Sequence, residues 1–273
     1  MKLTKPLAEL VVQEPGIEGI YKQIERAGRV CYASEPKEGV TSKMFVDRLV
    51  NSGHGSVLEH GTVYLTIPNL MGHVDKASFY ISHKYSDVIA DRGDVRSSGN
   101  YYITTNYRVL VENNKLEDLQ YLSEPSNKHI KRYTFFVNCD IGITRECNRH
   151  RAFSVSEQST RYCNFSKDKF LNEITFIKPC WLYEDNIDIE ARQEFEKALY
   201  NAEGSYMKLI DLGWKPQQAH KVLPLATASK IYYTAFENDW NHFLDLRCAP
   251  AAHPQAQEVA NIIKDKLSEI TNK

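Results

Sequence analysis

The chain has no apolar stretch of membrane-spanning length in its 273 residues. Its N-terminus, MKLTKPLAELVV, lacks the apolar core of a signal peptide. The net charge of −1 excludes a broadly basic surface, so any contact with a polyanion must be local. We therefore expect a cytoplasmic globular protein with neither a membrane nor a nucleic acid as partner.

Paired cysteines are also lacking. The six cysteines are scattered and form no C-x-x-C pair: Cys31, Cys139, Cys147, Cys163, Cys180 and Cys248. This pattern predicts a reduced protein without disulfides. A cysteine nucleophile is weakly supported as well, because no cation or histidine beside Cys180 marks a thiolate. We interpret all six as structural thiols.

The common cofactor and catalytic signatures are absent. There is no G-x-G-x-x-G after a strand, no phosphate-binding G-x-x-x-x-G-K-[ST], no H-E-x-x-H and no G-x-S-x-G. His54 and His60 lie six residues apart in HGSVLEH, which is not the spacing of two ligands on one helix face. No metal site is predicted.

Helical and strand patterns are interspersed without a regular period. Helices are predicted at 16–34, 41–53, 114–122, 144–150, 188–213, 216–224, 239–248 and after Pro254, and strands at 61–67, 100–111, 132–140 and 229–236. Thr144 and Asp239 are expected to begin their helices. Residues 68–100 are poorly periodic, and DRGDVRSSGN at 91–100 looks like an excursion. Without a βαβ repeat, the pattern favours an α+β fold over a doubly wound sheet.

The stretch NRHRAFSVSEQSTRY, from Asn148 to Tyr162, has the most selective chemistry. Guanidinium groups match phosphate oxygens bidentately and stay charged, and the Ser159 hydroxyl can complete a phosphate cradle. Glu157 is placed to hold a ribose hydroxyl or to orient Arg161. This combination of guanidinium groups, a hydroxyl and a carboxylate predicts a phosphate-bearing ligand. It does not distinguish a nucleotide, a flavin or an RNA. The alternative is a solvated surface loop.

Arg149-His150-Arg151, seven residues and then Ser159 resembles the R-H-R-x7-S signature of flavin-dependent thymidylate synthases. Three further segments resemble that family and follow its order along the chain: VLEH, AHKVLP and WNHFLDLRCAPAAHPQAQE. Together these segments cover most of the sequence.

The resemblance implies one domain over 1–273, with an extended insert at about 70–130. It also implies a curved, mostly antiparallel sheet packed with helices, in a homotetramer whose active sites are shared between chains. The implied reaction is reductive methylation of dUMP to dTMP with FAD, NADPH and methylenetetrahydrofolate, without a cysteine nucleophile.

The family pattern assigns residues to two sets. Arg247 would be catalytic, because a cation at the uracil edge favours the N3-ionised form and makes C5 nucleophilic. The implied dUMP set is Glu146, Arg149, Glu157, Gln158, Ser159, Thr160, Arg161, His220 and Arg247. The implied FAD set is His60, Thr62, Arg149, His150, Arg151, Glu157, His242 and His253.

Several positions depart from the family pattern. His220 stands where the family has arginine, and Glu146 where it often has glutamine. Phe236 and His242 stand where asparagine is frequent. These departures leave open a flavin-dependent methyl or hydroxymethyl transfer to another pyrimidine nucleotide.

Two further alternatives come from the residues themselves. The first is a single-stranded nucleic-acid module, in which Tyr162, Phe165 and Phe170 alternate with cations. The second concerns His60, which is either a flavin contact or a hydrogen-bonded structural histidine at a helix–strand junction.

Overall fold

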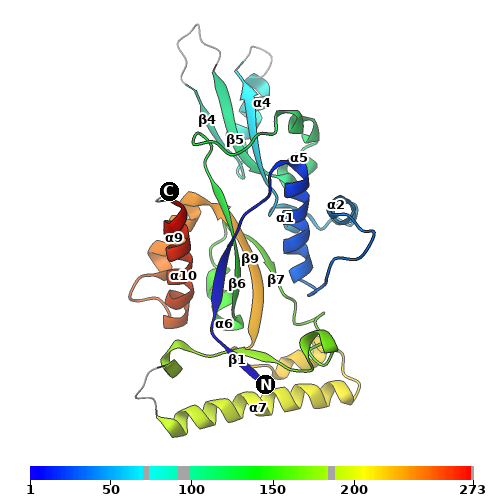
Figure 1. Ribbon diagram of the computed structural model, residues 1–273, viewed down its shortest axis with the longest axis vertical. Helices are drawn as coiled ribbons and strands as arrows, with labels where there is room; N and C mark the ends of the chain where they lie inside the picture. Colours follow the sequence, from blue (N-terminus) through cyan, green and yellow to red (C-terminus); the bar gives the residue numbers. More distant parts are fainter. Residues whose placement is uncertain (70–73, 92–98, 184–187, 272–273) are drawn as a thin grey trace.

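The fold is a stack of three layers along the long axis of the molecule, seen in a computed structural model that describes residues 1–69, 74–91, 99–183 and 188–271 (Figure 1). The layers are an upper lobe, a central sheet with helices, and a base that contains the long helix α7 at its lower edge. Of the described helices, none is at once long and apolar enough to cross a membrane.

The central sheet is antiparallel, with the strand order β2-β6-β9-β7. Its strands are β2 (Leu7–Val11), β6 (Arg132–Asp140), β9 (Ala228–Phe236) and β7 (Ser154–Glu157). β6 and β9 pair over nine residues, from Arg132 opposite Phe236 to Asp140 opposite Ala228. This register alternates large apolar residues with polar ones, so one face forms a core.

Three helices cover that apolar face: α6 (Ile141–Cys147), α9 (Glu237–Arg247) and α10 (Pro254–Thr271). Phe135 from β6 and Tyr233 from β9 are buried beneath them, together with Trp240 from α9. Cys147 and Phe153 belong to the same core. The last turns of α6 and α9 therefore lie over one face of the sheet.

The opposite face is covered by α1 (Gly16–Val30), beside α2 (Ser42–Asn51) and α3 (Gly55–Leu58). Thr41 caps α2, since its hydroxyl accepts a hydrogen bond from the Met44 amide. The Gly19 backbone of α1 lies so close to the Glu14 carbonyl that a Cβ atom would fall 1.7 Å from the oxygen. This contact fixes the entry of the chain into α1.

The upper lobe contains a second antiparallel sheet of order β3-β5-β4. Its elements are β3 (Thr62–Pro68), α4 (Val74–Ser82), β4 (Asp87–Ala90), β5 (Asn100–Asn106), α5 (Tyr107–Glu112) and the 3-10 helix η1 (Leu116–Tyr121). The apolar core of the lobe continues into α1, α2 and α3, which contribute Ile20, Val46 and Leu58 to it. The lobe also has a buried carboxylate, Asp118, which accepts from Lys76 (2.6 Å) and Tyr80 (2.9 Å). The lobe is thus packed onto the helices of the central layer.

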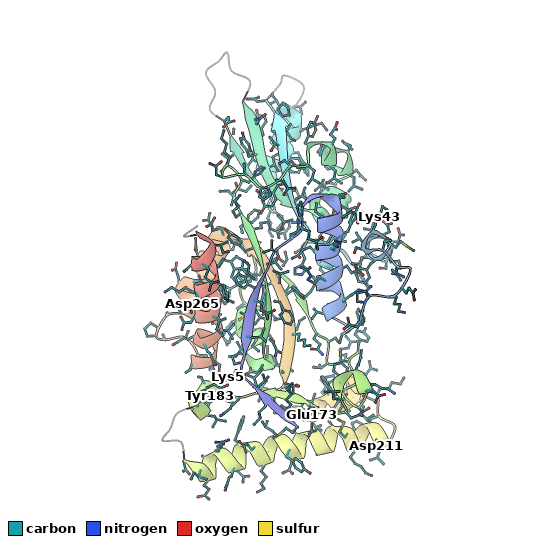
Figure 2. All side chains as sticks on the ribbon, in the orientation of Figure 1. Lys5, Lys43, Glu173, Tyr183, Asp211 and Asp265 are labelled. Atoms are coloured by element: carbon teal, nitrogen blue, oxygen red, sulfur yellow. The ribbon has the colours of Figure 1, made fainter. Side chains whose placement is uncertain are left out.

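The base holds a short parallel pair, β1 (Lys2–Thr4) with β8 (Thr175–Ile177), above α7 (Ile189–Asp211). It also holds α8 (Pro216–Ala219) and the 3-10 helices η2 (Asp168–Phe170), η3 (Cys180–Tyr183) and η4 (His220–Val222). Lys5 lies 4.3 Å from the centre of the Tyr183 ring, where the chain passes from the base to the central sheet (Figure 2).

The predicted α+β class with mostly antiparallel strands is confirmed, but several local predictions are wrong. α6 begins at Ile141, not Thr144, because the Asp140 carboxylate at the end of β6 caps it through the Ile143 amide (2.8 Å). The helix then ends at Cys147, so Arg149 and His150 lie in the turn beyond it.

Other boundaries differ for similar reasons. Phe236, not Asp239, is the N-cap of α9, since β9 leads directly into the helix. The predicted strand 100–111 ends at Asn106, whose side chain caps α5. The poorly periodic region 68–100 contains α4 and β4. The excursion predicted at 91–100 lies mostly outside the described residues, which omit 92–98.

Candidate functional site

The turn between α6 and β7 carries Arg149, His150 and Arg151 to the C-terminal end of α9. These three residues line a cavity of about 370 Å³ together with His242 and Arg247. We call it the arginine cavity. Residues distant in sequence meet here because α6 and α9 both lie on the apolar face of the central sheet.

The Arg247 guanidinium is held on all three nitrogens. Nη1 donates to Glu146 Oε2 (2.9 Å), Nη2 donates to the Glu146 carbonyl (2.7 Å), and Nε donates to His150 Nε2 (3.0 Å). Because His150 Nε2 accepts, its proton is assigned to Nδ1. The structure thus brings together the predicted catalytic arginine, one predicted dUMP ligand and one predicted FAD ligand.

His150 is uncharged in this arrangement. Burial lowers its pKa to about 4, and the charges of Arg247 and His242 act in the same direction. Phe243 packs against the ring, with centroids 4.9 Å apart. Arg149 remains 73% exposed in its side chain, so it is available to a ligand.

A second cavity of about 600 Å³ lies on the other side of Arg151, between the upper lobe and the α6–β7 turn. We call it the junction cavity. Arg132 lines it, and its Nη1 donates to Thr62 Oγ1 (3.3 Å), which places the predicted FAD ligand Thr62 beside this space. The Arg132 guanidinium lies 5.3 Å from the centre of the Phe236 ring.

His60 is a structural histidine in this chain. Its side chain is fully buried, its Nδ1 is hydrogen-bonded to Thr234 Oγ1 (2.8 Å), and its Nε2 to Ser156 Oγ (3.0 Å). Burial lowers its pKa to about 3. It lies between α3 and β3, which is the helix–strand junction expected for a hydrogen-bonded structural histidine. This geometry does not support direct contact of the ring with a flavin.

Glu157 faces the α6–β7 turn from β7. Its Oε1 accepts from Ser229 Oγ (2.8 Å) and its Oε2 from Asn148 Nδ2 (3.5 Å). The Asn148 side chain in turn accepts from the Tyr233 hydroxyl (3.0 Å). Glu157 is therefore linked by hydrogen bonds to the start of the R-H-R segment.

The remaining dUMP set does not share the arginine cavity. Arg161 is exposed and lies 5.4 Å from the centre of the Tyr162 ring, while Ser159 Oγ accepts from the Arg161 amide (3.2 Å) and Thr160 lies between them. His220 is in the base, with its Nδ1 3.2 Å from the Pro216 carbonyl.

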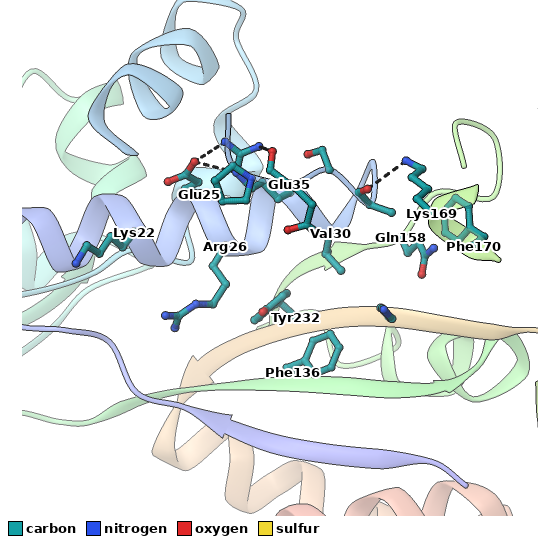
Figure 3. Close-up of a pocket in the computed structure, with 15 residues that line it drawn as sticks. Lys22, Glu25, Arg26, Val30, Glu35, Phe136, Gln158, Lys169, Phe170 and Tyr232 are labelled. Carbon is teal, nitrogen blue, oxygen red and sulfur yellow. Dashed lines mark hydrogen bonds and ion pairs between the residues drawn. The ribbon is translucent and has the colours of Figure 1, made fainter. Parts of the chain in front are cut away.

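Gln158 lines a third cavity, of about 520 Å³, between α1 and the sheet (Figure 3). Arg26 points from α1 toward Phe136 and Tyr232 on the sheet in this view. Arg26 donates to Gln23 Oε1 (3.3 Å) and has no carboxylate at ion-pair distance within the described ranges. The residues predicted to bind ligands therefore lie on separate surfaces of a single chain.

His253 of the predicted FAD set also lies apart from the arginine cavity. It precedes α10, and its Nδ1 accepts from the Gln255 amide (3.3 Å). Its ring is 6.0 Å from that of Trp181 in the base.

The aromatic platform required by the nucleic-acid alternative is not present. Phe165 is 6% exposed and packs on Phe170 and Tyr206 in the core of the base. Only Tyr162 of the three predicted stacking residues is well exposed, at 56%. The alternation of cations and aromatics in the sequence reflects core packing.

Sequence reasoning missed Arg132, Lys84 and Tyr85, which line the junction cavity. Arg132 carried one signal, a charged residue that begins an otherwise apolar alternating strand. Lys84 and Tyr85 carried none, because the chain brings them to the cavity through tertiary contacts of the lobe.

Comparison with known proteins finds a family model described as thymidylate synthase complementing protein, which matches residues 126–271, just over half of the chain. The match includes the α6–β7 turn and Arg247. It begins after the upper lobe and α1.

Individual relatives are named flavin-dependent thymidylate synthase. The protein from Thermus thermophilus is 31% identical over 144 residues, covering 50% of this chain and 53% of the relative. The protein from Kosmotoga olearia is 26% identical, covering 49% and 63%. The protein from Thermosipho melanesiensis is 32% identical, covering 54% and 69%. The chain thus spans about half the length of the Thermus relative.

Two of the histidines whose pKa values are lowered by burial, His60 and His150, should make the protein less stable in acid. The unfolded chain, with pKa values near 6.5, takes up protons first as the pH falls. The contribution of the two neutral rings to the free energy of unfolding is complete above about pH 6.5. It is lost as the pH falls toward the folded pKa values of about 3 and 4. Each histidine contributes a slope of at most about 1.4 kcal/mol per pH unit.

Urea unfolding at neutral pH and at about pH 5 measures this slope. His60→Gln should flatten it, whereas His54→Gln, at an exposed position, should not. An unchanged slope in His60→Gln would contradict the assignment of a buried neutral ring.

Proposed function

Since the chain belongs to the thymidylate synthase complementing protein family, we propose that it is a flavin-dependent thymidylate synthase. The proposed reaction converts dUMP to dTMP, with methylenetetrahydrofolate as one-carbon donor and NADPH as reductant. The observation that carries this proposal is the Arg247 guanidinium, fixed by Glu146 and His150 beside the R-H-R turn.

The described residues fit a phosphate-bearing dinucleotide such as FAD. Buried Arg132 Nε has no hydrogen-bond partner, and neither Arg132 nor Arg151 has a carboxylate at ion-pair distance in the described part of the chain. Arg149, Arg151 and His242 line the arginine cavity and would hold the cofactor there. When bound, FAD supplies the hydride and mediates transfer of the one-carbon unit.

Arg247 is the residue proposed to activate the substrate. A fixed guanidinium at the pyrimidine edge stabilises negative charge on the ring and makes C5 nucleophilic. His150 stays neutral and accepts from Arg247 Nε, so it orients the cation without competing for the anion. Binding of the ring would replace part of the contact between Arg247 and Glu146.

The environment of Cys147 supports a mechanism without a cysteine nucleophile. Burial raises the pKa of this thiol to about 12, although the Arg247 charge acts in the opposite direction. Cys147 is also 2% exposed and packed in the central core. Its thiol remains protonated and is shielded from a substrate.

A second candidate is alkylation of a cytosine nucleotide, and the side chain of Glu146 favours it. A carboxylate accepts from the exocyclic amine of cytosine. Two nitrogens of the neighbouring Arg247 can donate to the ring nitrogen and carbonyl. Uracil presents an acceptor where cytosine presents the amine, so it would face the carboxylate less favourably.

The homotetramer with shared sites is also proposed. It is supported by the separation of Arg161 and Ser159, in an exposed turn, from the arginine cavity with Arg247. A neighbouring chain would bring one turn to the other chain's cavity, and ligand phosphates would neutralise the cations on both sides.

Replacement of Arg247 tests the proposed function directly. Arg247→Ala should reduce dTMP formation on the order of tenfold to a hundredfold, since a charge-assisted hydrogen bond is worth about 1.5–3 kcal/mol. Arg247→Lys should restore little, because an ammonium lacks the planar fork. The readouts are dTMP by chromatography and flavin content by visible absorbance.

Flavin content should change much less than turnover in Arg247→Ala. A parent protein that cannot be loaded with FAD would refute the proposed function, and near-parent turnover in the variant would refute the role of Arg247.

Glu146→Gln separates the two candidate substrates. If the second candidate holds, the parent converts the base of dCMP, and Glu146→Gln shifts the preference toward dUMP by about tenfold, because the amide side chain can serve either base. If dUMP alone is converted by both proteins, the cytosine candidate is wrong.

Mixed assemblies test the shared site. Arg161→Ala and Arg247→Ala, unfolded together and refolded, should regain part of the parent activity, because some sites receive an intact side from each variant. Each variant refolded alone is the control. If mass spectrometry confirms mixing and no activity returns, the sites are not shared.

A further inference from the structure

Tyr233 is buried in the middle of the central sheet, and its hydroxyl reaches the α6–β7 turn. The side chain is 2% exposed and belongs to the apolar core beneath α6, α9 and α10. Tyr233 stands opposite Val155 of β7, so the two side chains lie on the same face of the sheet. Its hydroxyl donates to Asn148 Oδ1 (3.0 Å), just beyond the end of α6. A hydrogen bond from the core therefore holds the first residue of the turn.

Tyr233 also contacts the other end of this turn. Its ring centre lies 5.8 Å from that of Phe153, and the two rings meet edge to face. Between these contacts the backbone of the turn is closed on itself, because the Phe153 amide donates to the His150 carbonyl (3.1 Å). One residue of β9 therefore contacts both ends of the segment that carries the three R-H-R residues.

The side-chain amide of Asn148 connects Tyr233 to Glu157. Asn148 Nδ2 donates to Glu157 Oε2 (3.5 Å), and Glu157 Oε1 accepts from Ser229 Oγ (2.8 Å). A carboxylate only accepts, so the NH2 group of the amide must face Glu157 and its carbonyl must face Tyr233. The reverse orientation would place two acceptors side by side. One orientation of the amide thus satisfies both neighbours.

The Tyr233 hydroxyl selects this orientation of the amide. Burial raises the pKa of Tyr233, so the hydroxyl stays protonated and can donate. Without the hydroxyl, the Asn148 carbonyl would lose its donor, and the amide would be free to turn its NH2 group away from Glu157. The contact between Asn148 and Glu157 is long for a hydrogen bond, which leaves Glu157 Oε2 able to accept from a ligand as well.

We propose that Tyr233 is a positioning residue of the nucleotide site, which acts through Asn148 to aim the Glu157 carboxylate at the sugar hydroxyl of the substrate. Glu157 contacts the substrate, whereas Tyr233 and Asn148 do not. The inference rests on the proposed function, in which the substrate is a deoxynucleoside monophosphate. It holds for either candidate base, because dUMP and dCMP both carry a free 3′-hydroxyl.

Calorimetric titration of the flavin-loaded protein tests the proposal, with dUMP and its 2′,3′-dideoxy analogue as probes. The parent should bind dUMP about tenfold to a hundredfold more tightly, because the analogue lacks the hydroxyl that donates to a charged acceptor. Tyr233→Phe keeps the ring but should reduce this ratio by about threefold to tenfold, as expected for the loss of one neutral hydrogen bond. Its affinity for the analogue should match that of the parent. The dCMP pair replaces the dUMP pair if only cytosine nucleotides bind.

Asn148→Asp is the second variant. The new carboxylate can still accept from Tyr233 but offers no donor to Glu157, so the ratio should fall at least as far as in Tyr233→Phe. Asn148 is exposed, so this variant should fold even if Tyr233→Phe does not, and it then decides alone. Adding Tyr233→Phe to Asn148→Asp should reduce the ratio no further, because both substitutions act through one contact.

Tyr206→Phe is the matched control. The Tyr206 side chain is also fully buried, and its hydroxyl oxygen accepts from the Phe165 amide (3.3 Å), but in the core of the base. Loss of this hydrogen bond should lower the melting temperature about as much as Tyr233→Phe does. The ratio of the two affinities should stay at the parent value, because this hydroxyl lies in a different core.

A purely structural Tyr233 would weaken the binding of both probes equally, and an unchanged ratio would overturn the proposal. A parent protein that binds dUMP and its analogue with equal affinity would also overturn it, because Glu157 would then not be the acceptor of the sugar hydroxyl. Conversion of dUMP with an unchanged ratio in the variants refutes the inference and retains the proposed function. A parent that binds neither dUMP nor dCMP refutes the proposed function, and the inference with it.

Discussion

The antiparallel pairing of β6 with β9 is the constraint on which the rest of the structure depends. It joins segments almost a hundred residues apart in register over nine residues. Because β6 leads into α6 and β9 into α9, one pairing places both helices on one face, and their last turns meet. The contact of Glu146 with Arg247 is a consequence of that register.

The sequence predicted both strands, though not their pairing, because the local pattern of apolar residues indicates a strand and not its partner. The sequence did not determine the start of α6, because Asp140 and Thr144 can both cap a helix. In the structure the Asp140 carboxylate, at the end of β6, is the cap. Arg247 and the R-H-R turn were predicted from the resemblance of their segments to the family pattern. The sequence could not reveal that His60 is buried with both nitrogens bonded, because its partners, Ser156 and Thr234, are distant in sequence.

The same limit explains why the candidate ligands were predicted as one set but lie in several places. A linear motif records which residues a ligand needs and not which chain supplies them. In one chain, Gln158 faces α1, Arg161 faces solvent and Arg149 faces α9. Adjacent residues on a strand point to opposite faces, so a motif that crosses β7 is necessarily divided by the sheet.

The chain leaves the central layer at Thr62 and returns to it at Arg132, and these two residues are hydrogen-bonded to each other. The Arg132 amide also donates to the Tyr64 hydroxyl on the outgoing strand. A unit whose two ends lie side by side can be acquired or lost in evolution without changing the register of the sheet beneath it. The upper lobe thus has the topology of an insertion. Arg132 lies where the chain returns to the central sheet, so selection on an added lobe can act at this residue.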